Sequence, residues 1–485
     1  MSPWSVLGEA YPDGSRAVYG SSTTHLFKAL AGPRGLEVVA SAELARRRFT
    51  PHYNLFVLRG GDVVVQDRKA RRYLRFADAR LGDPRSPLRL VGAWTLPDGV
   101  RGAPTQVNVT FDGHVVALTD AGVLVAVRAD QLGRVPDPPV AVFDTRPAGG
   151  DLSTHNAFAV DETGGLFVVS HQAMTRVTWD GRAFRLAWRA PYDFLGPGCA
   201  GRAPTSQRRG VLMVARGRPC TGSGTTPTLL GPADGADDRL VVVVDGHRPR
   251  NHLVAFWRDR VPDDWAGLPG LDRRVAAVTA LPYSTPDGRG FTAENSPTAW
   301  GYTVATAQYN GLRPPCDPVR GVQQLRWDPR RRAFAVTWAT DRVNLNNVLT
   351  YSAGSGLVYG TGRQPAGAGG CAFHFYALDW ATGAVRVDLP LGSDRAFNDP
   401  GDQVTVLEDR SVVFGTSRGL VRVRPAGGGG HAAGLHQSDG ALRPRRPAGA
   451  SGLEAGGQHD AVLEPGPSLG DAADLAVVPV GPHLR

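Results

Sequence analysis

Short apolar runs separated by glycine-containing turns occupy most of the chain. The clearest unit lies between Asn346 and Gly383, where apolar runs are joined by the Ser355-Gly356 turn and by a glycine-rich loop. β-Branched and aromatic runs of this kind, bounded by glycine, are typical of antiparallel strands. No long stretch has the 3.6-residue apolar period of an amphipathic helix. The pattern therefore predicts an all-β protein built from meandering sheets.

One unit, consisting of a polar pair, an apolar strand, a turn and a second apolar strand, occurs seven times. The polar pairs are Tyr53-Asn54, Thr105-Gln106, His155-Asn156, Thr225-Thr226, Glu294-Asn295, Asn346-Asn347 and Asp402-Gln403. The starts lie about 50 residues apart, with two longer intervals, and this period is that of a four-stranded propeller blade. We therefore predict a seven-bladed β-propeller, although six or eight blades also fit the spacing.

The predicted ring covers residues 26–425, after a polar lead-in of residues 1–25. The seventh unit ends at Pro425, short of a fourth strand, whereas the runs Leu26–Leu30 and Leu36–Ala40 are spare strands near the N-terminus. We expect these N-terminal strands to complete the last blade, which would leave no open sheet edge. Residues 426–485 are rich in glycine, alanine and proline and predict a disordered tail.

The formal net charge of +9 changes this picture little. All but two of the 54 basic residues are arginine, and they are scattered in twos and threes between strands. A solvated surface explains that distribution better than a nucleic-acid site, and no nucleic-acid motif is present. No export signal or membrane-spanning run is visible. We expect a soluble, cytoplasmic monomer that binds neither nucleic acid nor membrane.

The four cysteines favour a different cellular location. Cys199 and Cys220 bracket an arginine-rich loop, while Cys316 and Cys371 lie in loops of neighbouring repeats. Two bridges, Cys199–Cys220 and Cys316–Cys371, would favour an oxidising, extracellular location if the start of the chain is trimmed. None of the spacings is that of a zinc site.

The first strand of each propeller blade lines the central channel, so the polar pairs are expected to converge there. The residues expected in the channel are Asn54, Gln106, His155, Asn156, Thr226, Glu294, Asn295, Asn346, Asn347, Asp402 and Gln403. Hydrogen bonding to channel water explains such a ring without any chemistry. A functional interpretation makes His155 the general acid or base, with Glu294 and Asp402 as charge partners.

Other features of the sequence widen or narrow this interpretation. Carboxylate and amide oxygens from Glu294, Asn156, Asn347 and Asp402 would suit Ca²⁺, which is the cofactor we expect if there is one. The long connection Asn251–Phe291 carries Trp257 and Trp265, and an apolar wall for a substrate is expected there. Serine-hydrolase and phosphate-binding motifs are absent from the sequence.

Two segments resemble known propeller families. Ala377, Asp379, Thr382 and Gly383 match the repeat of quinoprotein-dehydrogenase-like propellers, but the tryptophan that follows that repeat and the adjacent cysteines of those enzymes are missing. The run His155–Ser170 is similar to the channel strand of gluconolactonase-like and strictosidine-synthase-like propellers. That resemblance implies lactone hydrolysis or condensation in the channel, with Asn156 at the metal-binding or tunnel-facing position.

The sequence therefore predicts a hydrolase, lyase or cyclase that acts on a small organic molecule, as in secondary metabolism, by acid/base chemistry in the funnel. A non-catalytic propeller that binds a protein or glycan on its rim is the alternative from another class. A quinoprotein-like oxidoreductase is the second alternative.

Overall fold

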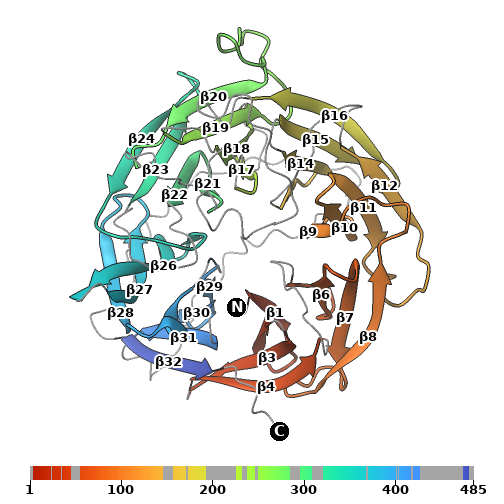
Figure 1. Ribbon diagram of the computed structural model, residues 1–485. Helices are drawn as coiled ribbons and strands as arrows, with labels where there is room; N and C mark the ends of the chain where they lie inside the picture. Colours follow the sequence, from red (N-terminus) through yellow and green to blue (C-terminus); the bar gives the residue numbers. More distant parts are fainter. Residues whose placement is uncertain are drawn as a thin grey trace, which may run out of the picture.

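The computed structural model describes residues 4–22, 24–33, 35–44, 55–145, 157–170, 173–192, 225–231, 238–245, 250–283, 295–307, 321–367, 370–399, 401, 403–416, 419–425 and 473–479. These residues form eight four-stranded antiparallel sheets. Figure 1 shows the sheets arranged as blades around one axis, with the first strand of each blade innermost and the fourth outermost. The predicted β-propeller is confirmed, and the predicted count of seven blades is corrected to eight.

We name the blades A to H in chain order. Blade A comprises β1 (Trp4–Ala10), β2 (Arg16–Ser21), β3 (His25–Gly32) and β4 (Gly35–Glu43), and blade B comprises β5 (Leu55–Val57), β6 (Val63–Asp67), β7 (Arg72–Asp78) and β8 (Leu88–Thr95). Blade C comprises β9 (Pro104–Val109), β10 (His114–Thr119), β11 (Val123–Arg128) and β12 (Val140–Asp144), and blade D comprises β13 (Ala159–Val160), β14 (Gly165–Val169), β15 (Ala173–Trp179) and β16 (Phe184–Pro191). Blade E comprises β17 (Thr228–Leu230), β18 (Leu240–Val244), β19 (His252–Trp257) and β20 (Val275–Ala280), and blade F comprises β21 (Thr298–Trp300), β22 (Thr303–Ala307), β23 (Val322–Asp328) and β24 (Ala333–Thr340). Blade G comprises β25 (Thr350–Ser352), β26 (Leu357–Ala366), β27 (Gly370–Asp379) and β28 (Val385–Gly392), and blade H comprises β29 (Thr405–Val406), β30 (Val412–Gly415), β31 (Gly419–Pro425) and β32 (Ala473–Pro479). A single turn of 3-10 helix, η4 (Arg395–Phe397), precedes blade H.

The additional blade is the N-terminal one. Each of the seven predicted repeat starts precedes or begins the first strand of a separate blade, from B to H. Strands β1 and β2 lie in residues that the sequence assigned to a lead-in, and with β3 and β4 they form blade A. The run WSVLGEA of β1 contains glycine and glutamate in place of a valine-rich core, which is why its strand pattern is weak.

The ring closes without the strand exchange that the sequence predicted. Blade H takes its outer strand from β32, which pairs with β31 from Gly419–Pro479 to Pro425–Ala473. Blade A keeps all four of its strands. Part of the segment predicted as a disordered tail, residues 473–479, therefore completes the last blade.

The strands are buried on both faces because each blade packs between two others. In β18, Val241 and Val243 contact the core shared with blade D, whereas Leu240, Val242 and Val244 contact the core shared with blade F. This sandwiching accounts for the uninterrupted apolar run of β18. Strands β19 and β20 lie inside the segment Asn251–Phe291 that the sequence predicted as one long connection, so that prediction was wrong for those residues.

The antiparallel strand order gives the ring two different faces. The connections between first and second strands and between third and fourth strands emerge on one face, which we call the turn face. The connections between second and third strands, and from each fourth strand to the next blade, emerge on the opposite face, which we call the loop face. Asp161–Gly164 therefore lies on the turn face, and the connection Asp245–Asn251 begins and ends on the loop face.

Arginines on third strands join three blades to their neighbours on the turn face. Each guanidinium binds an aspartate of its own blade and donates to a backbone carbonyl of the next blade. The three sets are Arg75 with Asp62 and Ala129, Arg176 with Asp161 and Arg258, and Arg422 with Asp409 and Gly32. The last set joins blade H to blade A and so closes the ring. At two other junctions an indole N–H makes the link: Trp179 donates to Asp112 at 3.0 Å, and Trp327 donates to Asp238 at 2.7 Å.

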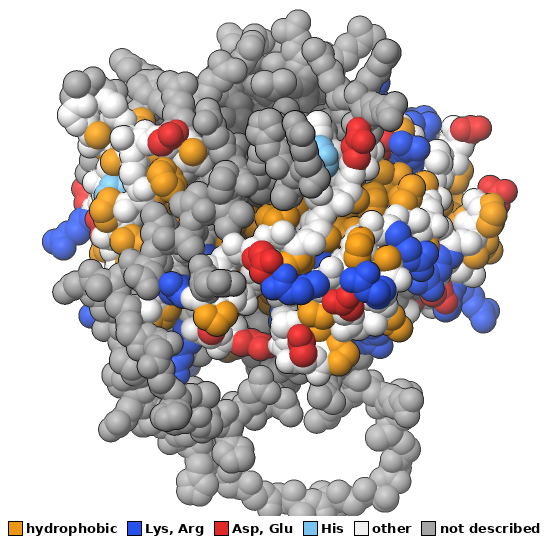
Figure 2. Space-filling model, turned by 90° about the horizontal axis from the view of Figure 1, so that it is seen from below, with side chains coloured by type: hydrophobic (Ala, Val, Ile, Leu, Met, Phe, Trp, Pro, Cys, Tyr) orange, Lys and Arg blue, Asp and Glu red, His pale blue; other side chains and the backbone are white. Residues whose placement is uncertain are grey.

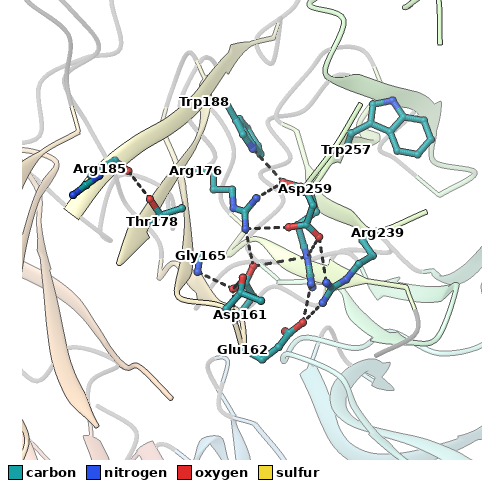
Figure 3. A network of polar contacts seen from close by, with 12 residues as sticks. Asp161, Glu162, Gly165, Arg176, Thr178, Arg185, Trp188, Arg239, Trp257 and Asp259 are labelled. Atoms are coloured by element: carbon teal, nitrogen blue, oxygen red, sulfur yellow. Dashed lines mark hydrogen bonds and ion pairs between the residues drawn. The ribbon is translucent and has the colours of Figure 1, made fainter. Parts of the chain in front are cut away.

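The largest of these links lies between blades D and E (Figure 3). The Asp161 carboxylate is fully buried and accepts from the backbone N–H of Gly165 at 2.7 Å and from Arg176 at 3.4 Å. Arg176 also lies 3.0 Å from Asp259, which belongs to blade E. Burial, with repulsion from Arg176, lowers the pKa of Arg274, whose guanidinium stacks 4.6 Å from the ring of Trp188. The network fixes blades D and E against each other.

Two surface features complete the description. The segment with the quinoprotein-like pattern is a turn: the Asp379 carboxylate accepts from the N–H groups of Ala381 and Thr382, and Gly383 has a positive φ of 70°. Figure 2 shows basic and acidic side chains interspersed on the side of the molecule in view. No helix in the described part of the chain is long and apolar enough to cross a membrane.

Candidate functional site

The polar side chains at the starts of the first strands form hydrogen bonds with backbone groups at the ends of the second strands. The Thr105 hydroxyl donates to the carbonyl of Leu118, and the Thr225 hydroxyl accepts from the N–H of Val244 at 2.9 Å. The Oδ1 of Asn347 accepts from the N–H of Thr361 in the same way, at 3.0 Å. These side chains replace ladder partners at the loop-face end of their blades, which explains the polar repeat by structure alone.

Asparagine leaves a donor at this position that threonine does not. The Nδ2 atoms of Asn295 in blade F and Asn347 in blade G are buried and have no hydrogen-bond partner among the described residues. The two side chains are 3% and 0% exposed. Buried amide donors normally bind an oxygen, so an ordered water or a ligand oxygen fits each of them.

Asn346 belongs to a buried polar cluster between blades G and H. Its Nδ2 donates to the carbonyl of Asp399 at 3.2 Å, and its Oδ1 lies 3.5 Å from a guanidinium nitrogen of Arg363. The Asp399 carboxylate accepts from the Thr361 hydroxyl at 2.7 Å and from the N–H of Gly401 at 2.8 Å. Arg363 and Asp399 were not predicted from the sequence, and these hydrogen bonds give the cluster a rigid, supporting geometry.

The other predicted residues are divided between described and undescribed parts of the chain. His155, Glu294, Asp402, Asn54 and Asn156 lie outside the described residues, so their predicted roles stay predictions.

Among the described ones, Gln106 is buried in β9, and the N–H of Thr226 donates to the Ser296 hydroxyl at 2.9 Å. Gln403 forms a parallel bridge with Val348. The described residues thus bring Asn346 and Asn347 together, and they put Asn295 at the matching place in the adjacent blade.

Trp257 packs inside the protein. Its side chain is 1% exposed, and its ring lies 5.8 Å from the rings of both Trp265 and Trp327 in the core between blades E and F. Figure 3 shows its indole pointing away from the neighbouring polar network, which its backbone carbonyl joins by accepting from Arg274. This position gives Trp257 a packing role in place of the substrate wall that the sequence predicted.

A histidine–aspartate pair that the sequence analysis missed lies on the loop face of blade E. Asp245 follows directly after β18, and its carboxylate binds the first residue of β19 twice, with 2.7 Å to the N–H of His252 and 2.8 Å to its Nδ1. The Asp245 side chain is 1% exposed, whereas that of His252 is 20% exposed. The Nδ2 of Asn251 donates to the Asp245 carbonyl at 2.8 Å and fixes the same corner.

The hydrogen bond to Asp245 determines which imidazole nitrogen of His252 can accept a proton. A carboxylate only accepts, so Nδ1 carries the proton in the neutral imidazole and Nε2 carries the lone pair. Asp245 continues the alternation of Val241 and Val243, and His252 that of Val254, so both side chains lie on the blade D side of blade E. The arrangement is that of a general base oriented by a buried carboxylate.

Two other histidine–aspartate contacts differ from this pair. The Nδ1 of His374 lies 2.6 Å from Asp388, whose carboxylate is 44% exposed on an outer strand. His114 lies 3.1 Å from Asp112, but its Nδ1 makes no well-aligned hydrogen bond among the described residues. Of these three pairs in the described residues, only the one in blade E combines a buried carboxylate with two hydrogen bonds to one histidine.

The proposed calcium ligands are not tested by the described residues. Asn347 uses its oxygen for the N–H of Thr361, and Glu294, Asn156 and Asp402 lie outside the description. Within the described ranges, no three His, Cys, Asp or Glu side chains gather as a metal site.

No protein-family model matches the sequence. An uncharacterized protein of Archaeoglobus fulgidus is 28% identical over 408 residues, which cover 78% of this chain and 71% of that protein. Among solved structures, Sqt1 of Saccharomyces cerevisiae is similar with a TM-score of 0.46 and 8% identity, over 76% of this chain and 80% of that one. Virginiamycin B lyase from Staphylococcus aureus has a TM-score of 0.39 and 11% identity, over 74% of this chain and 90% of that one. Eight four-stranded sheets around one axis place the chain in the β-propeller superfamily.

Proposed function

We propose that this propeller is an enzyme that acts by acid/base chemistry on a small organic molecule bound at the loop face. The observation that carries the proposal is the contact between His252 and the buried carboxylate of Asp245. A carboxylate in this position selects the tautomer of the imidazole and stabilises the imidazolium that forms when Nε2 takes a proton. Lactone hydrolysis or a condensation/cyclisation is the reaction class that needs such a group.

In lactone hydrolysis, the Nε2 atom of His252 accepts a proton from the attacking water and returns it to the ring oxygen that leaves. Asp245 holds the imidazole ring of His252 in place through its bond to Nδ1. The proposal retains His155 as a second candidate for proton transfer, with Glu294 and Asp402 as its charge partners. The described ends of the connections that contain these three residues emerge on the loop face too.

Turnover of a panel of γ- and δ-lactones, followed with a pH indicator, tests this proposal. His252→Gln is expected to lower kcat/KM by about 100-fold or more, which is the usual contribution of a general base. Asp245→Asn is expected to lower it as well, because an amide nitrogen facing Nδ1 favours the wrong tautomer. His374→Gln, which changes the pair in blade G, is the matched control and is expected to leave turnover unchanged.

The variants show which histidine, if either, acts as the base. Loss of turnover in His155→Ala with full turnover in His252→Gln moves the role to His155. Full turnover in both variants contradicts acid/base catalysis by either histidine. A wild-type protein that opens no lactone contradicts the hydrolase form of the proposal.

We also propose that the protein works in an oxidising compartment. Cys371 is disulfide-bonded, and its partner is one of the three cysteines outside the described residues. Bridges of this kind form and persist outside the reducing cytosol. Peptide mapping without reductant is expected to link Cys371 to Cys316. A reduced Cys371 in protein isolated from its native host would contradict the compartment.

A further inference from the structure

Three aromatic rings form a continuous row across blades F and G. Trp300 ends β21, Tyr351 lies in β25, and Trp380 follows β27. The ring centroids of Trp300 and Tyr351 are 5.7 Å apart, and those of Tyr351 and Trp380 are 4.3 Å apart. Since β21 and β25 are the innermost strands of their blades, the row begins beside the central axis (Figure 1).

The row lies on the turn face, so it is separate from the histidine pair of the loop face. Trp300 and Tyr351 adjoin the turns that lead to second strands, and Trp380 begins the turn that leads to β28. His252 begins a third strand and therefore lies at the opposite end of its blade.

The row is rigid at one end and open at the other. The carbonyl of Trp380 accepts from the indole of Trp338 at 2.9 Å and from the amide of Gln324 at 2.6 Å, and its N–H donates to Gly356 at 2.9 Å. Trp300 is 58% exposed, which is more than Phe111, the other strongly exposed aromatic side chain among the described residues. The exposed indole of Trp300 packs against the ring of Tyr351 and presents a flat apolar surface to solvent.

A basic side chain lies two strands from Trp300 on the same face of blade F. Trp300 pairs with Thr303 across the hairpin, and Thr303 pairs with Arg326. Arg326 has the same orientation in β23 as Gln324, which contacts blade G, so Arg326 also lies on the side of blade F that faces blade G. It is exposed and makes no ion pair with any residue that the structure describes.

The size of the surface favours a small ligand over a protein partner. A stable protein interface buries about 800 Å² on each side, whereas one indole offers about 200 Å². In blades F and G, the other large hydrophobic residue described as exposed is Val336, on the outer strand β24. A ligand with one flat apolar face and one carboxylate matches an exposed indole with a guanidinium two strands away on the same face.

We propose that Trp300, Tyr351 and Arg326 form a binding site for an acidic glycan, in which a pyranose ring stacks on the indole and its carboxylate pairs with the guanidinium. The hydroxyl of Tyr351 makes no hydrogen bond to the described residues, so it is available to a sugar hydroxyl. The site does not depend on the catalytic proposal, and it gives the protein a point of contact with a polymeric glycan.

Isothermal titration of the full-length protein with trigalacturonate and with uncharged maltotriose tests the site. Trigalacturonate is expected to bind, to weaken about tenfold in Trp300→Ala, and to weaken by a similar factor in Arg326→Gln. Phe111→Ala is the matched control, because Phe111 is 52% exposed in the equivalent turn of blade C and has no ring neighbour among the described residues.

Affinity in the Phe111→Ala variant is expected to equal that of the wild type. Absence of trigalacturonate binding overturns the proposal, as does binding that survives Trp300→Ala. Equal affinity for maltotriose would overturn the role of Arg326 and the acidic character of the ligand.

Discussion

Truncation after Pro425 is expected to destabilise the whole ring. The deletion removes β32 and leaves β31 as the edge of a blade, with seven residues that have lost their ladder partners. Leu420 and Val421 of β31 are fully buried, so the new edge carries apolar side chains that water would reach. Such an edge promotes unfolding and pairing with other chains. We expect a lower urea midpoint and association of the truncated protein in light scattering.

A second deletion separates the strand from the connection that leads to it. Pro425 pairs with Ala473, so a turn of about four residues can replace residues 426–472 and retain the hairpin. This shortened protein is expected to unfold at the wild-type urea concentration. A truncated protein as stable and monomeric as the wild type would show that β32 contributes nothing to the ring.

Asp161→Ala is expected to cost about 3 kcal/mol or more of the free energy of unfolding. The carboxylate is fully buried, and its removal leaves the N–H groups of Thr163 and Gly165 without their acceptor. It also removes one of the carboxylates that the buried guanidinium groups of Arg176 and Arg258 face. Breaking a buried ionic network by removing one partner is one of the larger single-residue penalties. Urea unfolding at constant m-value measures the loss.

Asp263→Ala is the control, because it lies in the β19–β20 connection and pairs with Arg260 in full exposure. We expect that change to cost less than about 1 kcal/mol. Equal losses in Asp161→Ala and Asp263→Ala would mean that the network of Figure 3 does not hold blades D and E together.

Much of the ring was predictable because one physical need repeats in it. A second strand needs a polar partner at its loop-face end, and Thr105, Thr225 and Asn347 supply that partner in three blades. The sequence therefore showed where each of seven blades begins. The same regularity was misleading about function, since a residue that completes a ladder has the same polarity as one that lines a channel.

Strands β1 and β32, which are among the strands that the sequence missed, have weak local signals for different reasons. Strand β1 carries Gly8 and Glu9 in its run, and the bond from Arg16 to the carbonyl of Gly8 helps to hold it. The run of β32 is short and lies in a long segment dominated by glycine, alanine and proline. Composition averaged over such a segment hides one strand, whose partner β31 is distant in sequence.

The histidine pair was within reach of the sequence. Asp245 follows the run Leu240–Val244, and His252 precedes the run that continues to Trp257. Two residues that end and begin paired strands face each other, as the register Val244–Leu253 shows. The pair was missed because β19 was assigned to a connection. The carboxylate's burial and its two bonds to His252 depend on blade packing and are not visible in the sequence.

The protonation of His252 tests the account most directly. In ¹⁵N-histidine-labelled protein, the signal assigned to His252 by its absence from His252→Gln is expected to show, in the neutral imidazole, a protonated Nδ1 and an unprotonated Nε2. Asp245→Asn is expected to abolish that preference. A His252 with the proton on Nε2 in the wild-type protein would contradict the assignment of this atom as the base.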